Sequence, residues 1–137
     1  MSYYFTCRSE LYEFVGAAAV QALQEHLKGA DAVEAVAARW FEFATARPRH
    51  YQLAFDLSYV AMPRIAFQRE GLINTIMYSL RLQQEVARGV IAILHGATSL
   101  PPNDDPIRWT VAQLEAYLTA FRCRDSGAWS PSPLPPC

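Results

Sequence analysis

The sequence has few charged residues, and their signs balance. Only 18% of its 137 residues are charged, with 12 basic against 13 acidic residues and a net charge of −1, where about 25% is typical of soluble domains. No basic stripe matches the phosphate backbone of a nucleic acid. No apolar run approaches the roughly 20 residues that a membrane-spanning helix needs. These shortages predict a soluble protein that by itself binds neither nucleic acid nor a membrane.

Motifs for catalysis and metal binding are also missing. The three cysteines stand far apart, at positions 7, 123 and 137, which fits a reduced cytoplasmic protein better than a disulfide framework or a metal knuckle. The six glycines are scattered, so no glycine-rich loop would hold phosphate, and no serine stands in a Gly-x-Ser-x-Gly elbow. His26, His50 and His95 lack partners at helical spacing. We therefore expect no enzyme, no cofactor and no metal site.

Apolar residues recur every three or four positions, and the alternating runs of strands are missing. This spacing predicts helices over about 9–28, from Asp31 to before Pro48, from Pro48 to about Tyr59, from about Gly71 to about 95, and over 106–123. Between 60 and 70 no pattern is convincing, and 96–104 has the composition of a loop. The expected fold class is all-α, a bundle of about five helices.

Several residues suit the ends of these helices. Asp31 with Glu34 three positions later predicts a capping box, and an aspartate before Pro106, Asp104 or Asp105, predicts the start of the last helix. Glycine costs about 1 kcal/mol inside a helix relative to alanine. Gly89 is therefore a candidate break in the long helix that begins near Gly71.

The most informative stretch is 39–55, RWFEFATARPRHYQLAF. Pro48 lacks the N–H that a continuing helix needs, but its fixed φ suits the first turn of a new one. Two helices should therefore meet there at a tight corner. Five aromatic residues flank this corner: Trp40, Phe41 and Phe43 before Pro48, and Tyr51 and Phe55 after it. Since each can bury about 150–250 Å², their meeting would hold a small helical domain together.

Two segments of the chain resemble the tetracycline-repressor-like (TetR) family of transcriptional regulators. The segment YYFTCRSELYEFV at 3–15 is similar to the family's junction between its DNA-reading head and its body, through Tyr4, Phe5, Arg8 and Leu11. The segment FATARPRHYQLAF at 43–55 matches the family's Pro-x-x-aromatic-x-Leu-x-Phe signature, through Pro48, Tyr51, Leu53 and Phe55. The resemblance implies a remnant of the junction (1–8) and a helical ligand-binding and dimerisation domain (9–124). The tail (125–137) is proline-rich and is expected to be disordered.

In the TetR family the body senses a small, usually apolar molecule in a cavity between helices and pairs with a second copy. Large apolar side chains that would line such a cavity are Trp40, Phe43, Phe55, Met62, Met77 and Tyr78. Residues at steps of four on the last helix that would form the dimer interface are Trp109, Gln113 and Tyr117. The family implies a small hydrophobic effector and a homodimer as partners. It also implies that this chain lacks its own DNA-binding head.

The residues themselves leave other interpretations open. Aromatic and methionine side chains at helical spacing are usually plain core, and the last helix would then pack between the long helix and the tail. A second function is a helical protein-interaction module without an effector, for example one that forms heterodimers unable to bind DNA. A cavity that a ligand fills would indicate the sensor, and a solid core with an exposed apolar groove would indicate the interaction module.

Overall fold

The chain is helical throughout the part that the structure describes. The computed structural model describes residues 8–56, 61–100 and 105–125, and these ranges contain no strand. They form α1 (Arg8–Leu27), α2 (Val33–Ala46), α3 (Pro48–Ala54), α4 (Pro63–Leu80), α5 (Gln84–Ser99) and α6 (Pro106–Asp125). The predicted all-α class is confirmed, as is the first helix within one residue at each end.

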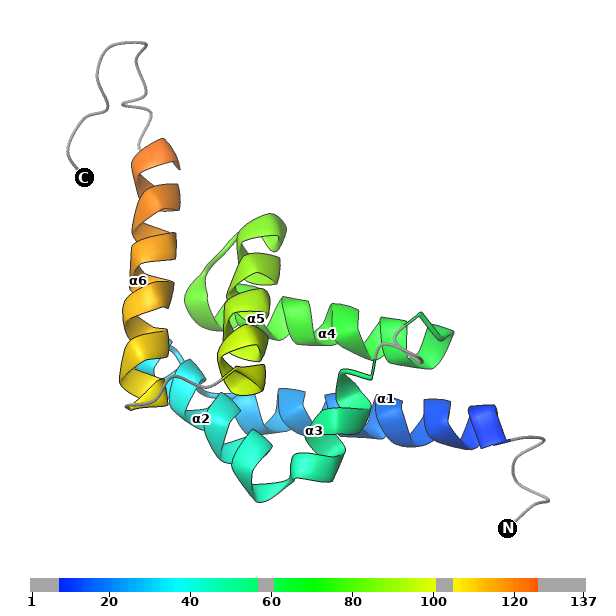
Figure 1. The fold of residues 1–137 in the computed structure, drawn as a ribbon. Coiled ribbons are helices and arrows are strands. Elements are labelled where there is room, and N and C mark those ends of the chain that lie inside the picture. The colour runs from blue at the N-terminus through cyan, green and yellow to red at the C-terminus, as the bar shows by residue number, and fades with distance from the viewer. Residues whose placement is uncertain (1–7, 57–60, 101–104, 126–137) are drawn as a thin grey trace.

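The six helices of the described ranges form a bundle with two main directions. The first helix, α1, lies along α4 and also contacts α3, while α5 and α6 contact each other and run across that pair (Figure 1). Helix α2 contacts α1, α3, α5 and α6, so it joins the two groups. In this position α2 buries Val36, Ala37, Trp40 and Phe43.

The core of the bundle is built from the apolar faces that the sequence spacing predicts. Its largest fully buried apolar side chains come from all the long helices: Val20, Leu23, Leu27, Val36, Trp40, Ile65, Leu72, Ile76, Val90, Leu94 and Leu114. Residues of α1, α2, α4 and α5 recur in this set at steps of three and four, as one face of an amphipathic helix requires. The periodicity in the sequence therefore reports correctly which side of these helices is covered.

The corner at Pro48 forms as expected. Helix α2 ends at Ala46, Arg47 has the non-helical angles φ −132° and ψ 65°, and Pro48 opens α3. Helix α3 ends at Ala54, earlier than the predicted end at Tyr59, a residue outside the described ranges. Trp40 contacts Tyr51 and Phe55 across the corner, with ring centroids 6.1 and 5.6 Å away. Three of the five predicted rings, Trp40, Tyr51 and Phe55, therefore meet across the corner, whereas Phe43 is buried against His26, with ring centroids 6.0 Å apart.

The prediction of one long helix from Gly71 is wrong. Helix α4 begins earlier, at Pro63, and stops at Leu80 because Arg81 takes a left-handed conformation with φ 55°. The Leu82 N–H then donates to the Met77 carbonyl at 3.0 Å, the bond that closes a Schellman-type helix end. Such ends usually carry glycine or asparagine, so an arginine at this position gave no sequence signal for the break.

Gly89 does not interrupt α5, which runs unbroken from Gln84 to Ser99. The glycine is required by packing instead. A Cβ atom placed at Gly89 would lie 1.8 Å from the Tyr117 hydroxyl oxygen and 2.4 Å from Cζ, so the Tyr117 ring of α6 occupies the space that a side chain would take. The cost of glycine in a helix is offset by this close approach of the two last helices.

The caps of two helices were predicted with different success. The capping box at Asp31 does not form, because α2 begins one residue later, with Ala32 as N-cap and no side-chain cap bond. For α6 the prediction is confirmed: the Asp105 carboxylate accepts bonds from the N–H groups of Ile107 and Arg108, both at 3.2 Å. Helix α1 ends at Leu27, and Gly29 follows two residues later with a φ of +87°, which glycine adopts most readily.

The proposed junction remnant (1–8) and proline-rich tail (125–137) lie almost wholly outside the described residues, as do the side chains of all three cysteines. In the ranges that are described, no helix has both the length and the apolar composition to cross a membrane.

Candidate ligand-binding site

The six predicted cavity residues do not gather at one place. Trp40 and Phe43 are buried in the core, and Met62 and Met77 are half-buried against it. Phe55 is half-buried and contacts Trp40. Tyr78 is 88% exposed on α4. Of the six, only Trp40 and Phe55 belong to the same cluster of rings.

That cluster contains a hydrogen-bonded chain from three helices. The Trp40 indole N–H of α2 donates to the Tyr51 hydroxyl oxygen of α3 at 3.2 Å, and this hydroxyl lies 2.7 Å from Nδ1 of His95 in α5. When Tyr51 donates its single proton to Nδ1, the His95 proton is on Nε2. Nε2 is then the ring nitrogen left for a ligand.

Phe55, the residue that follows α3, packs among these polar groups. Its ring stacks on His95 with centroids 4.6 Å apart and an interplanar angle of 21°. The Tyr51 ring is 4.9 Å away, and the Arg69 guanidinium carbon of α4 lies 5.6 Å from the Phe55 centroid. We call Trp40, Tyr51, Phe55 and His95 the Tyr51–His95 cluster. Its neighbours restrain the Phe55 ring in a half-buried position.

Two hollows open beside this cluster, and Phe55 and His95 line both. The first, the Tyr51 hollow, has a volume of about 400 Å³ and neutral walls: Ala44, Pro48, Tyr51, Gln52, Phe55, His95, Thr98 and Ser99. The second, the Arg69 hollow, has a volume of about 320 Å³ and is lined by Phe55, Arg69, Leu72, Ile73, Arg88, Ile91, Ala92 and His95. The stacked pair thus separates a neutral hollow from a basic one.

The surroundings keep the cluster neutral and the second hollow positive. Burial raises the pKa of Tyr51, partly offset by hydrogen bonds with Thr98 and Trp40. Burial and then the Arg69 charge lower the pKa of His95. Burial and then the Arg88 charge also lower the pKa of Arg69, although a guanidinium stays protonated at neutral pH. At that pH His95 is therefore a neutral hydrogen-bonding group beside two cations.

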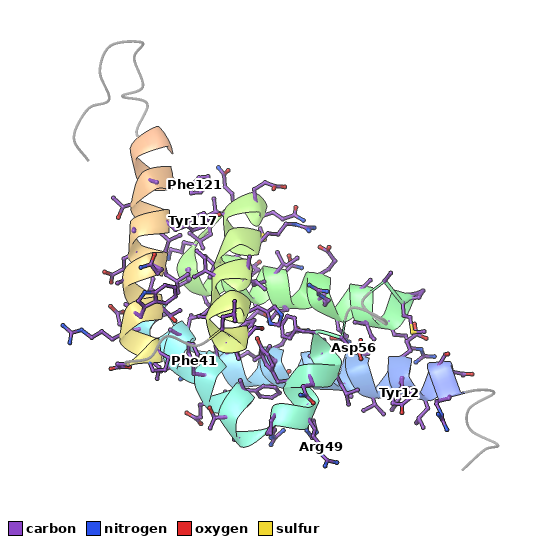
Figure 2. The ribbon with its side chains drawn as sticks, viewed as in Figure 1. Tyr12, Phe41, Arg49, Asp56, Tyr117 and Phe121 are labelled. Atoms are coloured by element: carbon purple, nitrogen blue, oxygen red, sulfur yellow. The ribbon has the colours of Figure 1, made fainter. Side chains whose placement is uncertain are left out.

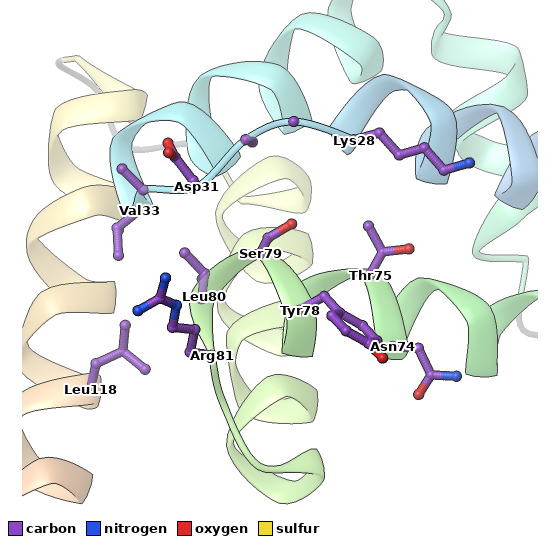
Figure 3. Close-up of a pocket in the computed structure, with 13 residues that line it drawn as sticks. Lys28, Asp31, Val33, Asn74, Thr75, Tyr78, Ser79, Leu80, Arg81 and Leu118 are labelled. Carbon is purple, nitrogen blue, oxygen red and sulfur yellow. The ribbon is translucent and has the colours of Figure 1, made fainter.

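A larger groove, of about 820 Å³, lies between the α1–α2 connection and the end of α4 (Figure 3). Its lining mixes polar side chains with apolar ones such as Val33, Leu80 and Leu118, with Asp31 on one wall and Ser79 and Arg81 on the other. Of the predicted cavity residues only Tyr78 lines it. Three charged residues, Lys28, Asp31 and Arg81, line this groove, so size alone does not make it the better site for a small apolar molecule.

The three predicted interface residues on α6 differ in exposure. Trp109 is 46% exposed and Gln113 is exposed. Tyr117 is half-buried, because its ring covers Gly89 and packs at an edge-on angle against Phe121, 4.9 Å between centroids. Figure 2 shows Tyr117 and Phe121 along α6. Trp109 and Gln113 are therefore available to a partner, whereas Tyr117 already joins α6 to α5.

No three histidine, cysteine or carboxylate side chains gather as metal ligands within the described ranges.

No protein-family model, curated protein or solved structure matches the chain. What the site does must therefore be argued from its own geometry.

Sequence reasoning found part of this site and missed the rest. It placed Trp40, Tyr51 and Phe55 at one corner, but read His95 as an isolated histidine. Tyr51 and His95 are 44 positions apart, so no local spacing connects them. Arg69 lies in the stretch between 60 and 70 for which no pattern was convincing.

Proposed function

We propose that this chain is the small-molecule-sensing and dimerising body of a cytoplasmic TetR-like transcriptional regulator. The observation that supports the proposal most is the Tyr51–His95 cluster with its two hollows. Two aromatic residues of the family-like signature, Tyr51 and Phe55, border an opening of about 400 Å³ that reaches the bundle between α3 and α5. That volume falls within the usual range of small-molecule sites.

The position of the hollows suits a sensor. Their walls come from α2, α3, α4 and α5, with the Tyr51 hydroxyl and the His95 ring as fixed polar groups among apolar side chains. Helix α5 in turn contacts α6. A ligand that changes the packing of Phe55 on His95 would act directly on the helix that supports α6. The last two helices are those that pair in TetR-family dimers.

The proposed homodimer uses the open side of α6. Thr110, Leu114 and Leu118 of this helix are buried inside the chain, whereas Trp109 and Gln113 lie outside that stripe. Large aromatic residues at a polar surface are typical of protein interfaces. Reading an operator is not part of the proposal for these 137 residues; an in-frame helix-turn-helix in the DNA upstream would support the family assignment.

A thermal-shift screen with neutral apolar compounds tests the sensor. We expect some compounds to raise the melting temperature, and we expect Phe55→Leu to reduce that rise because its ring borders both hollows. The matched control is Phe67→Leu, since Phe67 is 75% exposed on α4 and lines neither hollow. Absence of any shift, or equal shifts in the two variants, contradicts ligand sensing at this site.

Light scattering after size-exclusion chromatography tests the dimer. We expect a dimer at micromolar concentration for the wild-type chain and a monomer for Trp109→Glu, because a carboxylate would have to be buried in the interface. Arg49→Gln, an exposed substitution on α3 (Figure 2), should leave the dimer intact. A monomeric wild-type chain would rule out the family-type assembly.

The second candidate function, a protein-interaction module, draws on a different surface. A hollow of about 430 Å³ between α1 and α4 is lined by Phe14, Ala17, Ala18, Phe67 and four further residues. An exposed phenylalanine at such a hollow is typical of a docking surface. If no compound binds the chain and Phe67→Leu weakens a heterodimer with a related regulator, this function replaces the sensor.

A further inference from the structure

The Arg69 hollow combines an apolar surface with an excess of positive charge. Leu72, Ile73, Ile91, Ala92 and the Phe55 ring supply the apolar surface. The polar groups of the lining are two guanidinium groups and one imidazole, from Arg69, Arg88 and His95. No carboxylate is part of this lining.

The two arginines differ in their ionic partners. The Arg88 Nη2 atom lies 3.2 Å from the Glu70 Oε1 atom in an ion pair that is about half exposed on both sides. Arg69 is half-buried and makes its cation–π contact with Phe55. Within the described ranges no carboxylate lies at salt-bridge distance from Arg69. Asp56, next to Phe55 in the chain, already interacts with another group and does not line the hollow.

Among the described residues that line this hollow and their ionic partners, one positive charge is therefore left uncompensated. Arg88 and Glu70 cancel, His95 is neutral at neutral pH, and Arg69 remains. A half-buried cation with another cation nearby is less stable than a paired one, and it gains the most from a bound anion. A guanidinium also binds a carboxylate through two parallel hydrogen bonds, which fixes the orientation of a ligand.

We propose that the Arg69 hollow binds a small organic monocarboxylate with an apolar or aromatic body. The carboxylate pairs with Arg69, and the body covers Ile73, Ile91 and Phe55. This inference rests on the proposed sensing function and names its ligand class. One negative charge balances the site, and the volume of about 320 Å³ is at the lower end of the range for small-molecule sites.

The His95 ring gives the ligand a second contact. Its Nδ1 atom lies 2.7 Å from the Tyr51 hydroxyl oxygen, and when Tyr51 donates to Nδ1, the Nε2–H group can donate a hydrogen bond to a carboxylate oxygen. The Tyr51 hollow on the other side of the ring has no charged residue in its lining. The difference in charge between the two hollows selects the Arg69 side for the carboxylate.

The test uses 4-phenylbutyrate, its neutral amide and inorganic phosphate as probes, with the full chain and isothermal titration calorimetry. We expect 4-phenylbutyrate to bind at least ten times more tightly than the amide. Arg69→Gln should lose at least tenfold in affinity for the acid and little for the amide, and Arg69→Lys should recover part of that loss because it keeps the charge. Spectra of isoleucine methyl groups should show ligand-induced shifts at Ile73 and Ile91.

The control variant is Arg49→Gln, which removes an exposed arginine whose side chain points away from the bundle (Figure 2). It should bind 4-phenylbutyrate as the wild-type chain does. Circular dichroism of each variant establishes that it is folded before titration. An equal loss in Arg49→Gln and Arg69→Gln would show that only the overall charge matters, and would overturn the proposal.

The remaining outcomes separate the ligand class from the function. If acid and amide bind equally well with shifts at Ile73 and Ile91, sensing stands and the anion inference fails. If inorganic phosphate binds as tightly as the acid and depends equally on Arg69, the apolar body has no role and the inference also fails. If no probe binds and the screen with neutral compounds is negative as well, the sensing function fails together with it.

Discussion

Gly89 offers the sharpest test of how the last two helices pack. In an exposed helix, alanine in place of glycine adds about 1 kcal/mol of stability. At Gly89 the new Cβ atom would lie 1.8 Å from the Tyr117 hydroxyl oxygen and 2.9 Å from Cε2. The Tyr117 ring would have to move and would lose its contact with Phe121. We therefore expect Gly89→Ala to destabilise the protein, against the helix propensity.

The magnitude follows from two opposed effects. Overpacking a well-filled contact costs about 1–3 kcal/mol, and the gain in helix propensity returns about 1 kcal/mol. Gly89→Ala should thus lower the free energy of unfolding by about 1 kcal/mol. In a Tyr117→Ala background the ring is gone, and the same Gly89→Ala change should raise it by about 0.5–1 kcal/mol. The effect of one substitution changes sign with the state of its neighbour.

Urea denaturation followed by far-UV circular dichroism, at fixed protein concentration, measures all four members of this double-mutant cycle. Gly96→Ala is the matched control in the same helix, because a Cβ atom at Gly96 would meet no atom within 4 Å. It should add about 0.5–1 kcal/mol of stability. If Gly89→Ala stabilises the wild-type chain as much as Gly96→Ala does, the packing of Tyr117 on α5 is refuted.

Three further predictions concern stability. Arg81→Gly should raise the free energy of unfolding by about 0.5 kcal/mol in urea denaturation, because glycine adopts the left-handed angle of φ 55° without strain. The gain is small because glycine also makes the unfolded chain freer. A lower free energy of unfolding in this variant would contradict the prediction. Asp105→Ala should cost about 0.5–2 kcal/mol in the same assay, since α6 loses its cap, while Asp105→Asn should cost less. Burial and the Arg69 charge hold the pKa of His95 below its ordinary 6.5 in the folded protein, so as pH falls through about 6.5 the unfolded chain takes up more protons than the folded one. The neutral form of His95 therefore stabilises the folded chain fully above about pH 6.5, and this contribution is lost as the pH falls below that value. His95→Asn should flatten the pH dependence of the melting temperature below about pH 6.5. An unchanged slope would show that other groups cause the pH dependence.

Local chemistry in the sequence was enough for three of the marked helix ends, although not for the start of α2, where the capping box at Asp31 does not form. A glycine with positive φ follows the end of α1, the corner forms where a proline opens α3, and Asp105 caps α6 before Pro106. In each case the signal acts within one turn of the residue concerned, so no distant partner is needed to interpret it. The all-α class follows from the same periodicity, which shows which face of each helix is apolar.

Where a helix end lacked such a marker, the prediction was wrong. Arg81 is an unusual residue for a left-handed helix end, and the break between α4 and α5 was therefore missed. Gly89, by contrast, looked like a break and is not one. The sequence shows only that this glycine disfavours the helix. The reason for a glycine at this position is the ring of Tyr117 on another helix, which occupies the space of a side chain.

The candidate site depends most on tertiary structure. Periodicity says that a side chain faces inward but not which partner it meets, and Tyr51 and His95 are joined by a 2.7 Å contact across 44 positions. The positive charge beside Phe55 likewise arises only when α3, α4 and α5 come together. The sequence by itself determined the class of fold, the corner and three of its rings. The tertiary structure decided the hydrogen-bonded chain and the basic hollow, because both are made of groups that no helix holds alone.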